Sequence, residues 1–275
     1  MILEVAQPIP AVHPRFKNYP GLTSDEGARA EMISRRFFLA ATTGFALTPE
    51  FVAASDEVPV MLDHILLGCS DLDRGIDFVE KHTGVRAAFG GVHPGRGTRN
   101  ALLSLGEKHY LEIIAPDPQQ SGAPDHYGLS KLTEPRLVGW AAHPGDLSQF
   151  ATRLRNAGLA FDGPTPGSRK RPDGRLLQWK TLNLKEDREG MLPFFIEWSV
   201  DTVHPSADAP LGCNIFGFGL VAPDNSELAN LCKLLELDVS VIHGAPSEFF
   251  ANIFGSPGHV LALKSKPTGW LVTPT

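Results

Sequence analysis

VMLDHILLG, the stretch at residues 60–68, is a short apolar run with a buried-looking polar residue. Its length and flanks predict a β-strand. A helical pattern follows, which Asp71 is suited to cap and which Gly84 ends. Three more strands, separated by turns that contain glycine, are predicted at residues 85–89, 100–105 and 110–114. The predicted order of elements is therefore β-α-β-β-β.

The same order recurs about 75 residues further along the chain. A strand is predicted at residues 137–141, and an amphipathic helix at 146–157 ends at Gly158. Three strands follow, at residues 160–161 onward, 176–184 and 194–200. The segments GCSDL at 68–72 and HPGDL at 143–147 hold the same place in the two halves. A period of this size indicates an internal duplication.

A third and weaker pattern follows a linker rich in Pro, Ser and Asp at residues 204–210. It consists of a strand, a helix and two strands, at residues 216–222, 226–235, 239–243 and 260–263. We interpret it as a degenerate βαβββ-like unit that serves as scaffold rather than as active site. The expected division is a first module, a second module and a third unit, at residues 60–118, 135–202 and 211–272.

Composition limits the class of protein. The hydrophobic content of 42% and the charged content of 20% are ordinary for a globular chain, which excludes wholesale disorder. A net charge of −6 argues against a nucleic-acid partner, because phosphate contacts need a clustered basic surface. No apolar run reaches about 18 residues, so no membrane span is expected. Of the three cysteines, Cys213 and Cys232 either pair or, the favoured alternative, are buried small hydrophobes like Cys69.

The N-terminal segment has the pattern of an export signal. SRRFFL at residues 34–39 precedes a weakly apolar run at 40–47, and small residues follow at 53–55. The pair Arg35 and Arg36 makes this segment similar to a twin-arginine signal. The alternative is an amphipathic surface helix that contains two arginines by chance.

An export signal would set the limits of the mature protein. We expect residues 1–54 to be a disordered lead and a signal, with cleavage near Ala54 and Ser55. The mature protein would then be periplasmic or exported. Met32 lies two residues before the signal and is a natural start, which would make the residues from Met1 onward an extension.

Several motifs together resemble a known family. They are LDHILLG, GGVHPGRGTRN, YLEII, RPDG, Trp179 and LPFFIEW, at residues 62–68, 90–100, 110–114, 171–174, 179 and 192–198. In this order they are similar to the glyoxalase-like branch of the vicinal-oxygen-chelate superfamily. The resemblance implies an α+β fold, in which two βαβββ modules curl their sheets into half-barrels around one polar pocket, beside the degenerate third unit.

The resemblance also implies a metal site on the first and last strands of each module. By position its ligands are His64 and Glu112 in the first module, and Gly139 and Glu197 in the second. Glycine cannot bind a metal, so the expected set is His64, Glu112 and Glu197, with the space beside Gly139 left open. Ionisable groups on apolar strand faces are costly unless they are paired or metal-bound. One imidazole and two carboxylates suit a divalent ion such as Mn²⁺, Zn²⁺, Fe²⁺ or Mg²⁺.

Other residues are candidates for contact with a substrate. His93 lies in a glycine-rich loop, and Thr98 and Asn100 follow it with side chains on one side of the next strand. Arg171, in a Pro-Asp-Gly turn, would hold an anionic part of the ligand, unless it is surface charge. Trp179 is taken as a further contact, although tryptophans in this pattern are more often core residues.

The resemblance implies a metal-dependent enzyme of lyase or isomerase type that acts on a small oxygen-rich molecule. Glu197 or Glu112 would move the proton, and His93 would do so if both carboxylates bind the metal. The alternative is a metal-free binding module of the same fold. The expected partner is a small molecule, and a homodimer is compatible with the sequence.

Overall fold

The apolar run at residues 60–68 contains strand β1 (Leu62–Gly68), which is buried along its whole length. The computed structural model of the protein describes residues 57–120, 122–171 and 173–266. The signal-like segment and its two arginines lie outside the described residues. The rest of the first module comprises α2 (Leu72–Thr83), β2 (Ala88–His93), β3 (Thr98–Ser104) and β4 (Tyr110–Pro116).

The predicted ends of helix α2 are confirmed. The side chain of Asp71 accepts a hydrogen bond from the backbone N–H of Arg74, and Gly84 closes the helix with φ +71°. Strand β2 begins later than predicted and continues to His93, which is paired with Thr98 across the hairpin to β3. His93 is therefore held by a strand rather than by a free loop.

The second module repeats the order of the first. It comprises β5 (Arg136–Ala142), α3 (Leu147–Asn156), β6 (Phe161–Lys170), β7 (Leu176–Leu184) and β8 (Phe194–Trp198). A short 3-10 segment, η1 (His126–Lys131), lies between the modules, and α4 (Pro205–Asp208) follows β8.

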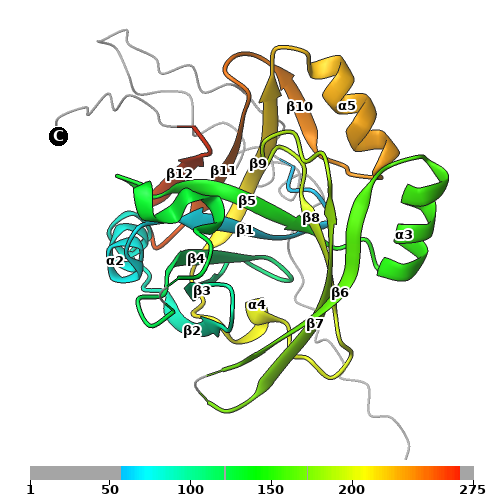
Figure 1. The fold of residues 1–275 in the computed structure, drawn as a ribbon. Helices are drawn as coiled ribbons and strands as arrows, with labels where there is room; N and C mark the ends of the chain where they lie inside the picture. Colours follow the sequence, from blue (N-terminus) through cyan, green and yellow to red (C-terminus); the bar gives the residue numbers. More distant parts are fainter. Residues whose placement is uncertain (1–56, 121, 172, 267–275) are drawn as a thin grey trace, which may run out of the picture. The chain divides into compact units, whose positions relative to one another are not determined.

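The two modules share one curled sheet of eight strands, in the order β2-β3-β4-β1-β5-β8-β7-β6. Within each module the first and last strands are parallel, and the modules join where β1 and β5 run antiparallel. The edge strands β2 and β6 contact each other, so the sheet wraps around its concave face, with α2 and α3 outside (Figure 1). The predicted α+β fold with half-barrel sheets is confirmed.

The third unit has the predicted order of elements but its own sheet. It comprises β9 (Asn214–Ala222), α5 (Asn225–Leu234), β10 (Ser240–His243), β11 (Glu248–Phe254) and β12 (Val260–Lys264). The strand order β10-β9-β11-β12 differs from that of the modules, and β11 was not predicted. Trp140 of β5 packs on Phe218 of β9, with ring centroids 4.9 Å apart, inside a core that the two sheets share.

Two expectations from composition can be compared with these elements. No helix among the described residues is long and apolar enough to cross a membrane. The cysteines Cys69, Cys213 and Cys232 are buried and free, which confirms the interpretation as small hydrophobes.

Candidate functional site

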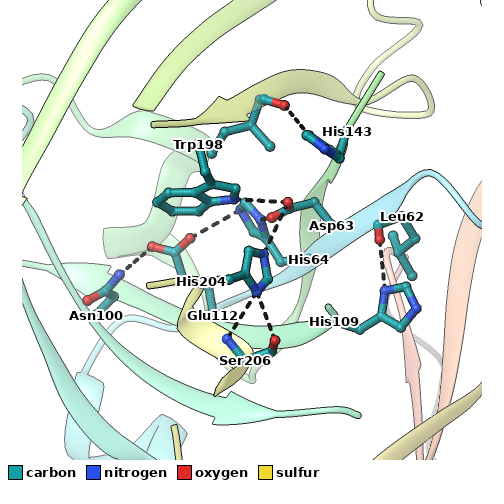
Figure 2. A network of polar contacts seen from close by, with 11 residues as sticks. Leu62, Asp63, His64, Asn100, His109, Glu112, His143, Trp198, His204 and Ser206 are labelled. Carbon is teal, nitrogen blue, oxygen red and sulfur yellow. Dashed lines mark hydrogen bonds and ion pairs between the residues drawn. The ribbon is translucent and has the colours of Figure 1, made fainter. Parts of the chain in front are cut away.

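Strand β1 presents two adjacent polar residues to one cluster. Regular alternation would send Asp63 and His64 to opposite faces. The pairing of β1 with β5 shifts register between Leu62 and His64, and this irregularity brings both side chains together. Nδ1 of His64 lies 2.6 Å from Oδ1 of Asp63 (Figure 2). The imidazole is only 2% exposed and stacks on Tyr110.

Asp63 is the centre of this cluster. Besides His64, its carboxylate accepts a hydrogen bond from Nε1 of Trp198 at 3.0 Å, and Nε2 of His204 lies 3.3 Å away (Figure 2). Burial opposes ionisation of Asp63, but the hydrogen bonds and charges of His204 and His64 outweigh it and hold its pKa well below the usual range. An ionised Asp63 can only accept a hydrogen bond, so it favours the His64 tautomer with the proton on Nδ1 and the lone pair of Nε2 toward the cavity.

Glu112 on β4 faces that nitrogen. Its Oε2 lies 3.5 Å from Nε2 of His64, while its Oε1 accepts a hydrogen bond from Nδ2 of Asn100 at 2.6 Å. Burial alone would raise the pKa of Glu112, yet the positive charge that His93 and His64 carry when protonated, the Asn100 hydrogen bond and Arg169 together lower it. Glu112 is thus an ionised carboxylate on the cavity wall near neutral pH.

The hairpin of β2 and β3 adds the next groups. Nδ1 of His93 lies 2.8 Å from Oγ1 of Thr98, and its Nε2 lies 3.6 Å from Oε1 of Glu112. Burial is the main cause that lowers the pKa of His93, so its imidazole is neutral near pH 7. Five predicted residues are therefore brought together, namely His64, His93, Thr98, Asn100 and Glu112.

These side chains line a cavity of about 470 Å³ on the concave face of the sheet. Its other walls are largely aromatic and come from Tyr110, Tyr127, Trp179, Phe194 and Trp198. The structure thus places the predicted contact residue Trp179 in the cavity. Such a volume and such a mixture of apolar walls with few polar groups are typical of small-molecule sites.

Arg169 on β6 also lines the cavity, although the sequence argument did not single it out. Its Nη1 donates a hydrogen bond to Oδ1 of Asn100 at 2.5 Å. This contact fixes the orientation of the amide, whose Nδ2 then faces Glu112. Arg169 is the first of three consecutive basic residues in the sequence, and only the long strand β6 shows that it is the one that points inward.

The prediction that Arg171 lies in the pocket is wrong. Its Nη1 is bound to Oδ1 of Asp208 at 2.7 Å, and its Nε lies 3.6 Å from Oδ2 of Asp173. Arg171 does not line the cavity. Two acidic neighbours already neutralise it, so it is a structural ion pair between the turn after β6 and helix α4.

The prediction that Glu197 joins His64 and Glu112 is also wrong. Oε2 of Glu197 accepts a hydrogen bond from the backbone N–H of Leu147 at 2.7 Å, and its Oε1 binds Nζ of Lys180 at 3.1 Å. Glu197 therefore points away from the cavity, toward the first turn of α3, and can neither bind an ion at His64 nor act on a ligand there. On β8 the cavity face carries Phe194, Ile196 and Trp198 instead.

Tyr127 lies beside Gly139, and both residues also line a second cavity of about 330 Å³. A Cβ built on Gly139 would lie 3.7 Å from Cε1 of Tyr127, which is ordinary van der Waals contact. Tyr127 belongs to η1 and has a positive φ of 61°. The phenol ring thus stands where the superfamily pattern would place a fourth ligand.

The remaining donor pair can be tested for its fit to a divalent ion. Among the described residues, no group of three His, Cys, Asp or Glu side chains could hold a metal. Two ligand atoms at about 2.1 Å from one ion, at a tetrahedral angle, lie about 3.4 Å apart. The observed 3.5 Å between His64 Nε2 and Glu112 Oε2 fits that spacing, and Asp63 supplies the outer carboxylate that metal-binding histidines usually have. The site therefore fits an ion held by two protein ligands, with the other positions free.

Comparison with known proteins agrees with this architecture. The model of the family described as "Glyoxalase-like domain" matches residues 62–235, which is more than half of the chain. The chain belongs to this glyoxalase-like family. It is a member of the vicinal-oxygen-chelate superfamily, as the sequence motifs predicted. A comparison with curated proteins found no match.

Solved structures with a similar fold include a hypothetical protein from Staphylococcus aureus. It is 15% identical to this glyoxalase-like chain, with a TM-score of 0.53, and the match covers 74% of this chain and 84% of that one. A methylmalonyl-CoA epimerase from Mycobacterium tuberculosis is 20% identical over 51% of this chain and 87% of that one, with a TM-score of 0.38. The epimerase from Streptomyces coelicolor is 22% identical over 50% and 97%, with a TM-score of 0.39. At 15% identity the likeness to the Staphylococcus aureus protein concerns the fold alone.

Proposed function

We propose that this chain is a metal-dependent enzyme of lyase or isomerase type, which moves a proton on a small oxygen-rich molecule bound in the 470 Å³ cavity. The observation that carries the proposal is the pair His64 Nε2 and Glu112 Oε2, 3.5 Å apart on the cavity wall. A paired imidazole and carboxylate that both face a small-molecule cavity suit a divalent ion better than they suit packing.

His64 and Glu112 would hold the ion, and Asp63 orients His64 for that task. When bound, such an ion stabilises negative charge that develops on substrate oxygens. Asn100 keeps Glu112 in place through its 2.6 Å hydrogen bond. A ligand seated between the aromatic walls would displace water, which would strengthen each of these interactions.

His93 is the residue best placed to accept a proton. With its Nδ1–H directed at the Thr98 hydroxyl 2.8 Å away, the ring would carry its lone pair on Nε2, which lies on the cavity side, 3.3 Å from Nδ2 of Asn100. Because burial keeps His93 neutral near pH 7, the ring can act as a base without first losing a proton. Glu112 would then be free to remain a ligand.

A metal-free binding module is the second candidate. It is favoured by the small number of side chains in the cavity that could bind a metal. Among the described residues, the second module supplies no His, Cys, Asp or Glu side chain to the cavity. Its aromatic walls, with Trp179 and Trp198 at ring centroids 5.6 Å apart, would suffice to hold a ligand.

Titration with Mn²⁺, followed by the signal of the free ion in electron paramagnetic resonance, tests the first candidate against the second. Wild-type protein should bind one ion, and Glu112→Gln should weaken the binding by at least about tenfold. Glu197→Gln is the matched control, because it makes the same chemical change on the α3 side of β8, and it should bind Mn²⁺ like the wild type. A wild-type protein that binds no divalent ion would leave the binding module as the function.

A further inference from the structure

The cavity contains a positive charge that the protein does not neutralise. Arg169 is only 5% exposed, yet among the described residues its hydrogen-bond partner is the neutral amide of Asn100. Its Nε is buried and has no partner. Burial lowers the pKa of Arg169, with only a partial opposing effect of Glu112. Arg171, two residues further along the chain, is instead paired with Asp208.

The fold makes room for this guanidinium. A Cβ on Gly90 would lie 2.5 Å from Oδ1 of Asn100 and 2.7 Å from Nη1 of Arg169, closer than real atoms approach. Gly91 has φ +142° and would place a Cβ 3.2 Å from the same nitrogen. The two glycines on β2 thus let the arginine of β6 lie against β2, where the two edge strands meet. A buried charge that is admitted in this way and left unpaired is costly unless a ligand compensates it.

The lining of the cavity fits an anion of modest charge. Among the described residues that line it, Glu112 is the one carboxylate, and Arg96 and Arg169 are the cations, with Arg96 exposed. A single planar guanidinium with unused donors matches a carboxylate, which takes two parallel hydrogen bonds. A phosphate dianion would leave more of its charge uncompensated.

The position of Arg169 also indicates what lies next to the anion. The Asn100 amide joins Nη1 of Arg169 to Oε1 of Glu112, so the guanidinium and the donor pair are one amide group apart. We propose that Arg169 binds the carboxylate of a small organic acid that carries a second oxygen on the neighbouring carbon, which lies toward His64 and Glu112. The placement of that second oxygen rests on the proposed function, whereas the carboxylate contact does not.

Binding of lactate and malate, compared with lactamide and malamide, tests the carboxylate contact. The amides keep the second oxygen and lose only the charge, and fluorescence of Trp179 and Trp198 on the cavity wall reports binding. Wild-type protein should bind at least one acid about tenfold or more tightly than its amide. Arg169→Gln should abolish that preference, and Lys170→Gln, an exposed neighbour with the same loss of charge, should retain it.

Gly90→Ala provides a second route if Arg169→Gln fails to fold, because it displaces the guanidinium without removing it. This variant should also lose the preference for the acids. The proposal is overturned if wild-type protein prefers no acid over its amide, or if a folded Arg169→Gln or Gly90→Ala protein keeps the preference.

Measurements on protein stripped of metal on a chelating resin, with and without added Mn²⁺, separate the two proposals. A preference for acids without any Mn²⁺ binding supports the Arg169 site and rejects the metal-dependent enzyme. Mn²⁺ binding without that preference does the reverse.

Discussion

At the scale of single residues, Asp63 controls the direction in which His64 presents its lone pair. Asp63→Asn keeps the shape but removes the charge and replaces one acceptor by an N–H₂ group. We expect a loss of about 1–3 kcal/mol in the free energy of unfolding, because a buried donor of His64, Trp198 or His204 is left unpaired. Mn²⁺ affinity should fall about 10- to 100-fold, as for other outer carboxylates of histidine ligands.

Urea denaturation and Mn²⁺ titration measure these two effects separately. Asp162→Asn is a suitable control, because Asp162 is an exposed carboxylate on β6 whose ion-pair partner among the described residues is Lys185. It should change stability by less than about 0.5 kcal/mol. Mn²⁺ affinity that is unchanged in Asp63→Asn would show that Asp63 does not orient His64.

Two residues of the site, Asp63 and Arg169, were not predicted from the sequence, and the reason is physical in both cases. Asp63 sits beside His64, and alternation along a strand assigns neighbours to opposite faces unless an irregularity intervenes, which no local signal announces. Arg169 lies on a strand with mostly exposed residues, and it becomes buried only because β6 meets β2. His64 and Glu112, by contrast, lie in motifs that resemble the family, and the resemblance placed them together by position, while His93 was a candidate because of its glycine-rich surroundings.

At the scale of elements, Glu197 stabilises helix α3 rather than the cavity. The side chain of Asp146 accepts hydrogen bonds from the backbone N–H groups of Ser148 and Gln149. The N–H of Leu147, also in the first turn, donates its hydrogen bond to Glu197. Glu197→Ala should therefore lower the free energy of unfolding by about 0.5–2 kcal/mol, as expected for a lost cap.

Urea denaturation of Glu197→Ala and of Glu186→Ala gives the comparison. Glu186 is an exposed carboxylate beyond β7, and its loss should be close to neutral. Equal stability of the two variants would mean that the contact with Leu147 contributes nothing. Loss of Mn²⁺ binding in Glu197→Ala would restore the ligand role that the sequence suggested.

The strand β8 itself was predictable, but its orientation was not. In FFIEW both faces are largely apolar, with Phe195 fully buried against Phe150 of α3 and Ile196 on the cavity side. Apolar residues on both faces leave no alternation to indicate which one is concave. The resemblance placed Glu197 in the metal site by position, and it was the choice of the face that carries Phe195 and Glu197 as the concave one that failed.

At the scale of the whole described molecule, the third unit covers the face of the eight-stranded sheet opposite the cavity. Phe218 of β9 packs between Trp140 of β5 and Phe249 of β11, and all three belong to the core that the two sheets share. The sequence predicted its helix and three of its four strands. It did not predict β11, nor the strand order, because pairing between strands is set by contacts far apart in the chain.

Phe218→Ala tests whether this packing stabilises the molecule. Removal of a fully buried ring should lower the free energy of unfolding by about 3–5 kcal/mol, which is a large share of the roughly 5–15 kcal/mol that holds an ordinary domain together. Phe254→Ala is the control, since Phe254 on the same sheet is 49% exposed and should cost far less. Urea denaturation measures the free energy of unfolding of both variants.

Folded Phe218→Ala protein should still bind ligand normally, because its cavity lies on the other face of the sheet. Equal losses in the two variants would mean that the third unit is an appendage, with no core in common with the modules.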